Sequence, residues 1–355
     1  MITAKFILNN YTKSSFLNTG RKAGNCAYFY KNDKQHLITR ETDYVYGKLP
    51  NGILQMYAEN DGINIIHSDE TIYEKNGTKL TFVKKLSKAV GSDWGFEDPR
   101  SIIWNNENYL MFARRSLRNA AKFQVNFGKL DDNFNYIDNK VNDGKQLIEK
   151  NWQPIENKPG ICVYSVKPFQ LIDVFNNKYI NVENNFPLLL RGSSNIIQYG
   201  ENYIGLYHIR NEVFEYLHYI VLYDKNMKLI KMSDPFSFFG ANVEFNCYLD
   251  FKDNKFIIPV SIHDQLIYEF VLNNEIINKI LNKEFNDLTK DNTVFTRFYN
   301  DAKLSNNINA ALVLAGFSFD KNVLADAITL NHQNNYFRGN YQKALQIVLM
   351  GNYKK

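Results

Sequence analysis

The chain has 355 residues, of which 45% are hydrophobic and 22% charged, a composition typical of a soluble globular protein with a substantial core. Its formal charge of +5 is small for this length, and no block of Lys and Arg is long enough to indicate a nucleic-acid-binding arm. Cys26, Cys162 and Cys247 are widely separated and lack CxxC spacing, which argues against a disulfide framework and against a zinc site.

Neither a targeting segment nor a membrane span is evident along the sequence. The N-terminal stretch MITAKFILNNYTKSS lacks the apolar core of about 7 to 15 residues that a signal peptide needs. No later stretch reaches the roughly 18 continuous apolar residues of a membrane-spanning helix. We therefore expect a cytoplasmic protein without a membrane span.

Five segments share one pattern, a polar turn with Asn, Gly or Asp followed by a short apolar strand that ends in polar or charged residues. They are NGILQMYAEND from residue 51, ENYLMFARRS from 107, NKPGICVYSVKP from 157, ENYIGLYHIRN from 201 and NKFIIPVSIHD from 254. Their spacing of about 45 to 55 residues is typical of a four-stranded propeller blade. The pattern predicts an all-β protein with a five-bladed β-propeller, and a β-sandwich with similar hairpins is the alternative.

The strand ends in these five segments are rich in polar side chains. They carry Glu59, Asn60 and Asp61; Arg114 and Arg115; Tyr164, Ser165 and Lys167; His208 and Arg210; and His263 and Asp264. Because the strands of a propeller converge near its axis, we expect these ends to form one shared polar cavity.

The pattern changes after about residue 278, where apolar residues recur at the spacing of amphipathic helices. The polar stretch NNEIINKILNKEFNDLTKDN precedes these helices. We therefore predict a catalytic propeller domain over residues 1–278 and a helical C-terminal extension over residues 279–355. The extension is expected to be either the start of a longer helical part or a docking surface for a second copy or a further domain.

Four segments resemble a known enzyme family. GFEDPR, followed by NENYLMFARRS, is similar to the Glu-Asp-Pro-Arg signature of five-bladed β-propeller enzymes that include β-mannoside phosphorylases, β-1,2-mannosidases and β-1,2-mannosyltransferases. EKNWQPI with YSVKP, RGSSNIIQYGENYIGLYHIRN and EFNCYLDFKDNKFIIPVSIHD resemble three further family segments in the same order. The resemblance covers about residues 50 to 270.

Two departures from the family pattern concern phosphate binding. The His-Arg-Pro triplet of the family reads Val166, Lys167 and Pro168 here, and Asn246 replaces a glycine expected after Glu244 and Phe245. The phosphate-binding set of the phosphorylases is therefore not reproduced, which leaves inorganic phosphate in doubt as a substrate.

Glycosyl transfer needs a carboxyl group that exchanges a proton with the reacting oxygen. The resemblance implies that Asp98 has this catalytic role and acts through a sugar hydroxyl that relays the proton. Because Pro99 disfavours helical backbone at the preceding residue, we expect Asp98 to be extended toward the cavity. The alternative is that Asp98 and Arg100 form only an ion pair that stabilises a turn.

Glu97 is expected to bind sugar hydroxyls or to raise the pKa of the neighbouring Asp98 as a like charge. A solvated turn residue is the alternative. Arg100 is expected to contact the substrate.

Cations from several blades are expected to clamp a phosphate, since guanidinium groups bind phosphate oxygens bidentately. They are Arg114, Arg115, Arg118, Lys167, Arg191 and Arg210. Strand side chains alternate, so only one of Arg114 and Arg115 should face the cavity. Surface placement is the alternative for each.

Other side chains are predicted to hold the sugar. Trp152 offers a flat face for stacking, with a core position as its alternative, and Lys150 and Asn151 offer hydroxyl partners. The remaining predicted ligands lie at strand ends: Tyr164, Tyr207, His208, His263 and Asp264. Asp264 is a stronger candidate ligand than His263, because the strand of the resembling family ends in Asp at the matching place.

No GxSxG, P-loop, HExxH or GxGxxG motif occurs in a suitable context, so we expect no metal or other cofactor. The predicted function is that of an inverting glycosyltransferase, which moves mannose or a related hexose from a nucleotide-sugar or sugar-1-phosphate donor to a carbohydrate acceptor. The missing His-Arg-Pro triplet and the helical extension favour it. The alternatives are a glycoside phosphorylase, a glycoside hydrolase and a non-catalytic glycan-binding propeller.

Overall fold

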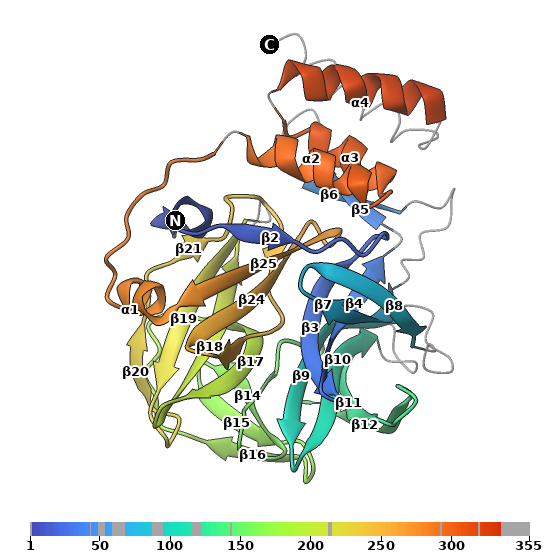
Figure 1. The fold of residues 1–355 in the computed structure, drawn as a ribbon. Helices are drawn as coiled ribbons and strands as arrows, with labels where there is room; N and C mark the ends of the chain where they lie inside the picture. Colours follow the sequence, from blue (N-terminus) through green and yellow to red (C-terminus); the bar gives the residue numbers. More distant parts are fainter. Residues whose placement is uncertain are drawn as a thin grey trace.

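The computed structural model describes residues 2–42, 44–48, 54–58, 68–86, 95–115, 122–142, 144–211, 215–291, 293–318 and 320–334. Five β-sheets surround a common axis, and helices follow at the C-terminal side of the chain (Figure 1). The prediction of an all-β, five-bladed propeller with C-terminal helices is confirmed.

Each blade is a largely antiparallel sheet built mostly from strands that are near one another in the sequence. Blade I contains β3 (Gly24–Lys31), β4 (Lys34–Thr42), β7 (Ser68–Asn76) and β8 (Lys79–Lys85). Blade II contains β9 (Phe96–Trp104), β10 (Glu107–Arg115), β11 (Phe123–Leu130) and β12 (Tyr136–Asn142). Blade III contains β13 (Gln153–Pro154), β14 (Ile161–Val166), β15 (Phe169–Asp173) and β16 (Lys178–Asn181).

The last two blades each take in a strand from the N-terminal region. Blade IV contains β17 (Arg191–Tyr199), β18 (Asn202–Arg210), β19 (Tyr216–Tyr223), β20 (Leu229–Met232), β21 (Phe236–Ser237) and β1 (Phe6–Ile7). Blade V contains β22 (Glu244–Phe245), β23 (Asp250–Lys252), β24 (Lys255–Ile262), β25 (Leu266–Asn273) and β2 (Ser14–Phe16). A short 3-10 helix, η1 (Leu8–Asn10), joins β1 to β2. Successive blades contact one another, and blade V contacts blade I.

Ring closure depends on the N-terminal strands. β2 pairs antiparallel with β25, with Ser14 opposite Phe270 and Phe16 opposite Tyr268. β1 pairs parallel with β21 of blade IV. Residues from the start of the chain thus complete two sheets formed near its end, which ties the ring together without a covalent link.

Two-residue turns explain much of the repeated pattern in the sequence. Both turn residues have positive φ in three hairpins, namely Asn32 and Asp33, Asn105 and Asn106, and Asp253 and Asn254. Positive φ at both positions is the requirement of a type I′ turn, for which Asn and Asp are favoured. Each of these turns leads into a blade strand that runs toward the same end of the propeller.

The first of the five predicted segments was assigned to the wrong strand. Residues of NGILQMYAEND form β6 (Leu54–Ala58), which, within the described part of the chain, pairs with β5 (Tyr44–Lys48) alone in a separate hairpin. The equivalent strand of blade I is β4, KQHLITRET, which follows the Asn32–Asp33 turn. Glu59, Asn60 and Asp61 lie outside the described residues.

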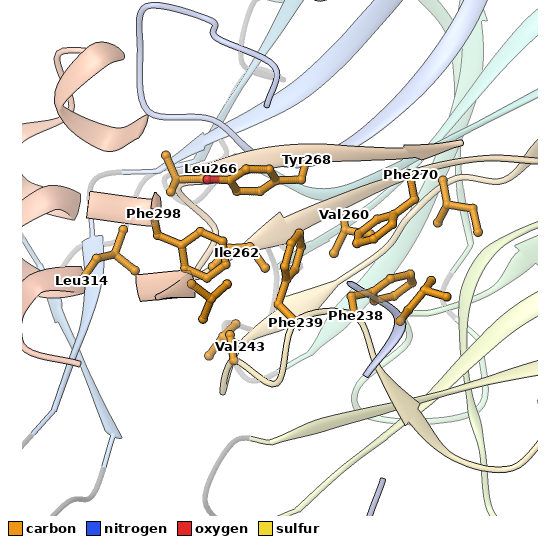
Figure 2. Packing of buried hydrophobic residues seen from close by; sticks show 14 of the residues in the cluster. Phe238, Phe239, Val243, Val260, Ile262, Leu266, Tyr268, Phe270, Phe298 and Leu314 are labelled. Carbon is orange, nitrogen blue, oxygen red and sulfur yellow. The ribbon is translucent and has the colours of Figure 1, made fainter. Parts of the chain in front are cut away.

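The helices are α1 (Asn274–Leu281), α2 (Val294–Leu304), α3 (Ile308–Ala315) and α4 (Lys321–Asn334). α1 spans residue 278, where we placed the domain boundary, so the division into two domains stays a prediction. Phe298 of α2 is fully buried between Phe239 and Tyr268 of the propeller, with ring centroids 5.3 and 5.2 Å away (Figure 2). The helices and blade V therefore share one hydrophobic core.

Two expectations from composition can be compared with the described residues. None of the described helices is both long enough and apolar enough to cross a membrane. Cys26, Cys162 and Cys247 are free thiols in buried positions.

Candidate active site

A cavity of about 190 Å³ lies at the end of the propeller where β9 and β17 begin and where β4 and β18 end. All five blades contribute to its lining, which also includes residues of β5. Eight predicted site residues line it: Glu97, Asp98, Lys150, Asn151, Arg191, His208, Arg210 and Asp264. The strand ends of the different blades thus meet around one cavity, as expected for a propeller.

Arg40 of β4 is the centre of an acidic half of the cavity. Its Nη2 lies 3.3 Å from Glu97 Oε1, and its Nη1 lies 3.6 Å from Asp98 Oδ1. Asp264 Oδ2 lies 4.0 Å from the same Nη1. Burial alone would lower the pKa of Arg40, but Tyr44 and the three carboxylates outweigh it and hold that pKa well above its usual value.

Asp98 lies on a β-bulge and not in extended backbone. Glu97 pairs with Ala113 and Arg100 with Met111, so Asp98 and Pro99 together face a single residue of β10. The φ of Asp98 is +54°, in the left-handed region. The prediction of extended backbone was therefore wrong, because the bulge places the residue differently from a regular strand. Proline suits such a position because it cannot donate a ladder hydrogen bond.

The side chain of Asp98 is almost fully buried and its orientation is fixed. Asn25 Nδ2 donates a hydrogen bond to Asp98 Oδ1 at 2.7 Å. Backbone at positive φ in a non-glycine residue is strained and is concentrated at functional sites. Asn151 and Asp264, two other cavity residues, share this conformation, with φ of +66° and +57°.

Arg100 supports the bulge and does not line the cavity. Its guanidinium donates to the backbone oxygens of Ser193 at 2.7 Å and of Asp98 at 3.1 Å, and to Asn151 Oδ1 at 3.4 Å. It therefore binds the main chain of Asp98 and not the carboxylate, so the alternative of a simple Asp98–Arg100 ion pair does not hold. We expected Arg100 to contact the substrate, and this expectation is corrected. Its hydrogen bonds link blades II, III and IV instead.

Asp264 lies in the turn between β24 and β25, against the backbone of blade I. Tyr44 donates its hydroxyl to Asp264 Oδ2 at 2.5 Å. Burial raises the pKa of Asp264, although Arg40 and the Tyr44 hydrogen bond oppose the effect. A Cβ on Gly24 would lie 2.4 Å from the Asp264 carbonyl carbon, so only glycine allows this approach.

The opposite half of the cavity is cationic. Lys150 from the segment before β13, Arg191 from β17 and Arg210 from β18 line it, and these residues belong to blades III and IV. His208 is buried beside them, with Nδ1 2.8 Å from Ser193 Oγ. Burial and then the nearby positive charges lower the pKa of His208 well below its usual value, so the ring is neutral at pH 7.

Several predicted phosphate ligands lie elsewhere. Arg114 is buried near Tyr136, where burial lowers its pKa, and it does not line the cavity. Lys167 is exposed in the turn between β14 and β15 and does not line the cavity. The side chain of Arg115 and the whole of Arg118 lie outside the described residues. Among the described residues, the cations that line the cavity besides Arg40 therefore come from blades III and IV, and Arg114 is not one of them.

Four predicted sugar ligands have structural roles. Trp152 is 1% exposed and donates Nε1–H to Glu149 Oε2 at 3.0 Å, so no ring face is open for stacking. Tyr164 donates to Glu149 Oε1 at 2.9 Å. Tyr207 is fully buried in the blade III–IV core, where its hydroxyl bonds to Tyr223. His263 is also buried, with its ring centroid 4.9 Å from that of Phe317.

The sequence analysis missed six lining residues: Asn25, Arg40, Tyr44, Tyr46, Tyr216 and Phe245. Arg40 could have been found, because KNDKQHLITRET has the same turn, apolar strand and charged end as the other units. Asn25 lies on β3, and Tyr44 and Tyr46 lie on β5, strands that have no counterpart in the repeated pattern. Among the described residues, no three His, Cys, Asp or Glu side chains are grouped as around a metal ion.

Glu70 is a second buried acid behind the cavity. It lies opposite Arg40 in the β4–β7 register and is 2% exposed. Among the described residues neither of its carboxyl oxygens has a hydrogen-bond partner. Burial raises its pKa well above the usual value, with Arg40 opposing and Asp98 adding to the shift. The folded protein therefore holds the Glu70 proton to higher pH than the unfolded chain does.

We expect Glu70→Gln to cost less than about 1 kcal/mol near neutral pH, because glutamine matches the shape of the protonated acid. The folded wild type holds its proton to higher pH than the unfolded chain. Its free energy of unfolding should therefore fall relative to that of the variant as the pH rises above about 4.3. Urea unfolding at pH 5, 7 and 9 measures this difference. The control is Glu74→Gln on the same strand, whose exposed carboxylate pairs with Lys34; equal pH profiles for both variants would contradict the assignment.

Comparison with solved structures finds enzymes that have the same fold as this chain. No protein-family model and no curated protein sequence matches the chain. A β-1,2-mannobiose phosphorylase from Listeria innocua superposes with a TM-score of 0.53 and 16% identity, over 74% of this chain and 92% of the other. A glycosyl hydrolase from Bacteroides ovatus gives 0.50 and 14%, over 72% and 85%. MPT-4, a mannose phosphorylase from Leishmania mexicana in complex with phosphate, gives 0.50 and 12%, over 78% and 93%.

At these identities the similarity concerns the fold. The resemblance inferred from the Glu-Asp-Pro-Arg stretch is confirmed at that level, since the structural neighbours are five-bladed propellers of the mannoside phosphorylase type. The chain thus has the fold of these carbohydrate-active enzymes, with a cavity at the ends of its blade strands.

Proposed function

We propose that the protein is an inverting glycosyltransferase that moves a sugar from a phosphate-activated donor to a hydroxyl of a carbohydrate acceptor. The observation that supports this best is the division of the cavity. Carboxylates gather around Arg40 in blades V, I and II, whereas Lys150, Arg191 and Arg210 come from the adjacent blades III and IV. A substrate with both a sugar and a phosphate fits this division.

Asp98 is the proposed catalytic base. The acceptor oxygen attacks the anomeric carbon, the bond from that carbon to the phosphate oxygen breaks, and the phosphate leaves with the electron pair. Asp98 takes the proton of the acceptor hydroxyl, either directly or through a neighbouring sugar hydroxyl. The hydrogen bond from Asn25 at 2.7 Å fixes the carboxylate for this transfer.

The cationic half would bind and stabilise the leaving phosphate. Arg191 and Arg210 supply guanidinium groups that match phosphate oxygens, and Lys150 adds a third positive charge. Negative charge grows on the phosphate as the bond breaks, so fixed cations at this place lower the barrier. His208 is neutral and buried, which suits it to hold the Ser193 side chain near these cations and not to carry charge itself.

The acidic half supports transfer to a sugar hydroxyl more than transfer to water. An inverting hydrolase needs a second carboxylate about 6.5 to 9.5 Å from the acid, free to activate water. Among the described residues of the cavity, the other carboxylates are Glu97 and Asp264, and both share Arg40 with Asp98. We assign them to holding sugar hydroxyls, because neither is set apart from Asp98 as a separate base for water.

A glycoside phosphorylase is the second proposal, and the names of the structural neighbours support it. Two of them are described as mannobiose and mannose phosphorylases, the latter with bound phosphate, which also makes mannose the proposed sugar. The exposed position of Lys167 favours the transferase, since the strand that carries a His-Arg-Pro triplet in the resembling enzymes places no cation in this cavity.

Incubation with mannose 1-phosphate or GDP-mannose and a β-mannoside acceptor tests the two proposals together. A transferase forms the extended mannoside and releases phosphate or GDP in equal amounts. A phosphorylase also runs in reverse, so that mannobiose and inorganic phosphate yield mannose 1-phosphate. Absence of product from a broader panel of hexose phosphates and nucleotide sugars, together with absence of binding by calorimetry, would overturn both.

A further inference from the structure

A buried chain of hydrogen bonds connects helix α3 to the wall of the cavity. Asn307, the N-cap residue of α3, donates Nδ2–H to Gln265 Oε1 at 3.0 Å. Gln265 donates Nε2–H to Thr42 Oγ1 at 2.8 Å and to the backbone oxygen of Tyr44 at 2.7 Å. These four side chains are all at most 4% exposed.

The chain ends at a carboxylate of the cavity. Tyr44 donates its hydroxyl to Asp264 Oδ2 at 2.5 Å, and Asp264 directly precedes Gln265 in the β24–β25 turn. Asp264 lines the cavity, whereas Gln265 bonds to α3 and to the β4–β5 segment. Of these two successive turn residues, Asp264 therefore faces the cavity, whereas Gln265 lies behind the cavity wall.

The direction of each hydrogen bond is determined by the backbone groups at its ends. The carbonyl oxygen of Tyr44 can only accept, so Gln265 must present Nε2–H to it and Oε1 to Asn307. Asn307 must therefore donate through Nδ2, and its Oδ1 accepts from the Ala310 amide at 3.2 Å. Only a side chain that both accepts and donates satisfies this position.

The turn needs such support because its backbone is strained. His263 and Asp264 both have positive φ, at +53° and +57°, and Asp264 is buried as a carboxylate at a cost that its hydrogen bond partly offsets. The His263 ring packs edge-on against Phe317, just beyond the end of α3. Contacts from the C-terminal helices thus reach both neighbours of Asp264.

We propose that Asn307 is a positioning residue of the active site, which holds the Asp264 carboxylate in place through Gln265 and Tyr44. The C-terminal helices are then a supporting wall of the catalytic cavity. The proposal rests on the proposed function, in which Asp264 binds the sugar.

The test is Asn307→Asp, which keeps an oxygen for the Ala310 amide but removes the donor to Gln265. The matched control is Asn273→Asp at the N-cap of α1, where the side chain accepts from the Ile276 amide at 3.0 Å and no bond to the cavity wall is present among the described residues. Asn307→Ser, which also caps but is too short to reach Gln265, is the second variant.

Two measurements follow. Amide hydrogen exchange in residues 262–266 should become about 10-fold faster in Asn307→Asp and Asn307→Ser, and unchanged in the control. With the substrates identified above, KM for the sugar should rise about 10-fold in both Asn307 variants, with kcat changed less. Equal exchange in the Asn307 variants and the control would overturn the proposal even if no substrate is found, since that readout needs no activity.

If the turn loosens as expected while KM stays at the wild-type value in an active enzyme, the link exists but does not position the sugar ligand, and the proposal is wrong. If the Asn307 variants unfold at the same denaturant concentration as the control, the change in the turn is local and the proposal stands. The failure of the proposed function would appear differently, as absence of turnover in the wild type.

Discussion

Asp98→Asn should lower kcat by about 100- to 10,000-fold, because the variant has no group to take the proton of the acceptor hydroxyl. Asparagine keeps an Oδ1 acceptor for Asn25, so the side chain should stay in place. The dissociation constant of the donor, measured by calorimetry, should therefore change by no more than a few-fold. Turnover with the identified donor and acceptor gives kcat.

The control for this variant is Asp132→Asn, a fully exposed aspartate in a turn of the same blade, which should leave kcat unchanged. Wild-type turnover in Asp98→Asn would remove the residue from the mechanism. Unaltered binding by both proteins, without turnover by the wild type, would instead indicate a glycan-binding propeller.

Arg40→Met should cost about 3 to 5 kcal/mol of unfolding free energy near neutral pH and abolish turnover. The change leaves the buried carboxylates of Asp98 and Asp264, and the partly buried one of Glu97, around a side chain that no longer carries a charge. Removal of one partner from a buried ion pair is strongly destabilising because the remaining charge is uncompensated. Urea unfolding followed by circular dichroism measures the loss.

The cost of Arg40→Met should depend on pH. Burial already raises the pKa of Asp264, and Arg40 is the main charge that opposes this shift. Without Arg40 the folded state holds the proton to still higher pH than the unfolded chain, so its stability falls as the pH rises above about 4. The deficit should therefore be smaller at pH 5 than at pH 8.

A matched control for the Arg40 change is Arg21→Met, an exposed arginine of the same blade region that lies over the Phe82 ring. It should change stability by no more than about 0.5 kcal/mol, since it compensates no buried charge. Equal effects of the two variants, or a deficit of Arg40→Met independent of pH, would contradict the role assigned to Arg40.

The repeated pattern was a sound basis for predicting the fold. Turns such as Asn105–Asn106 and Asp253–Asn254 require positive φ at two successive residues, and Asn and Asp are the side chains that tolerate it. The preference is local, so it can be read in the sequence. The pairing of β2 with β25 is not local, because it joins residues that are far apart in the chain.

Site residues could be predicted from the sequence where they lie at the end of a recognisable strand or in a recognisable motif. Arg210 and Asp264 were placed at strand ends and Asp98 was assigned from the Glu-Asp-Pro-Arg resemblance, and all three line the cavity. Their contributions to binding and catalysis remain predictions. Trp152 was misassigned because burial depends on the neighbouring blade, and sequence alone does not show that Glu149 accepts its Nε1–H.

Backbone strain was the feature that the sequence concealed most. The residue before a proline is usually extended, but in β9 the two-for-one pairing with β10 turns Asp98 into the left-handed region. That pairing is a property of the sheet and not of the Glu-Asp-Pro-Arg stretch. The role of Arg40 is likewise not visible in its local sequence, because it depends on acidic residues from two other blades.

The most direct test is a crystal structure of the protein with mannose 1-phosphate. The account predicts a sugar ring beside Asp98 and Arg40, with hydroxyls on Asp264, and a phosphate bound by Arg191 and Arg210. A sugar phosphate seated outside this cavity, or bound with its phosphate among the carboxylates around Arg40, would contradict it.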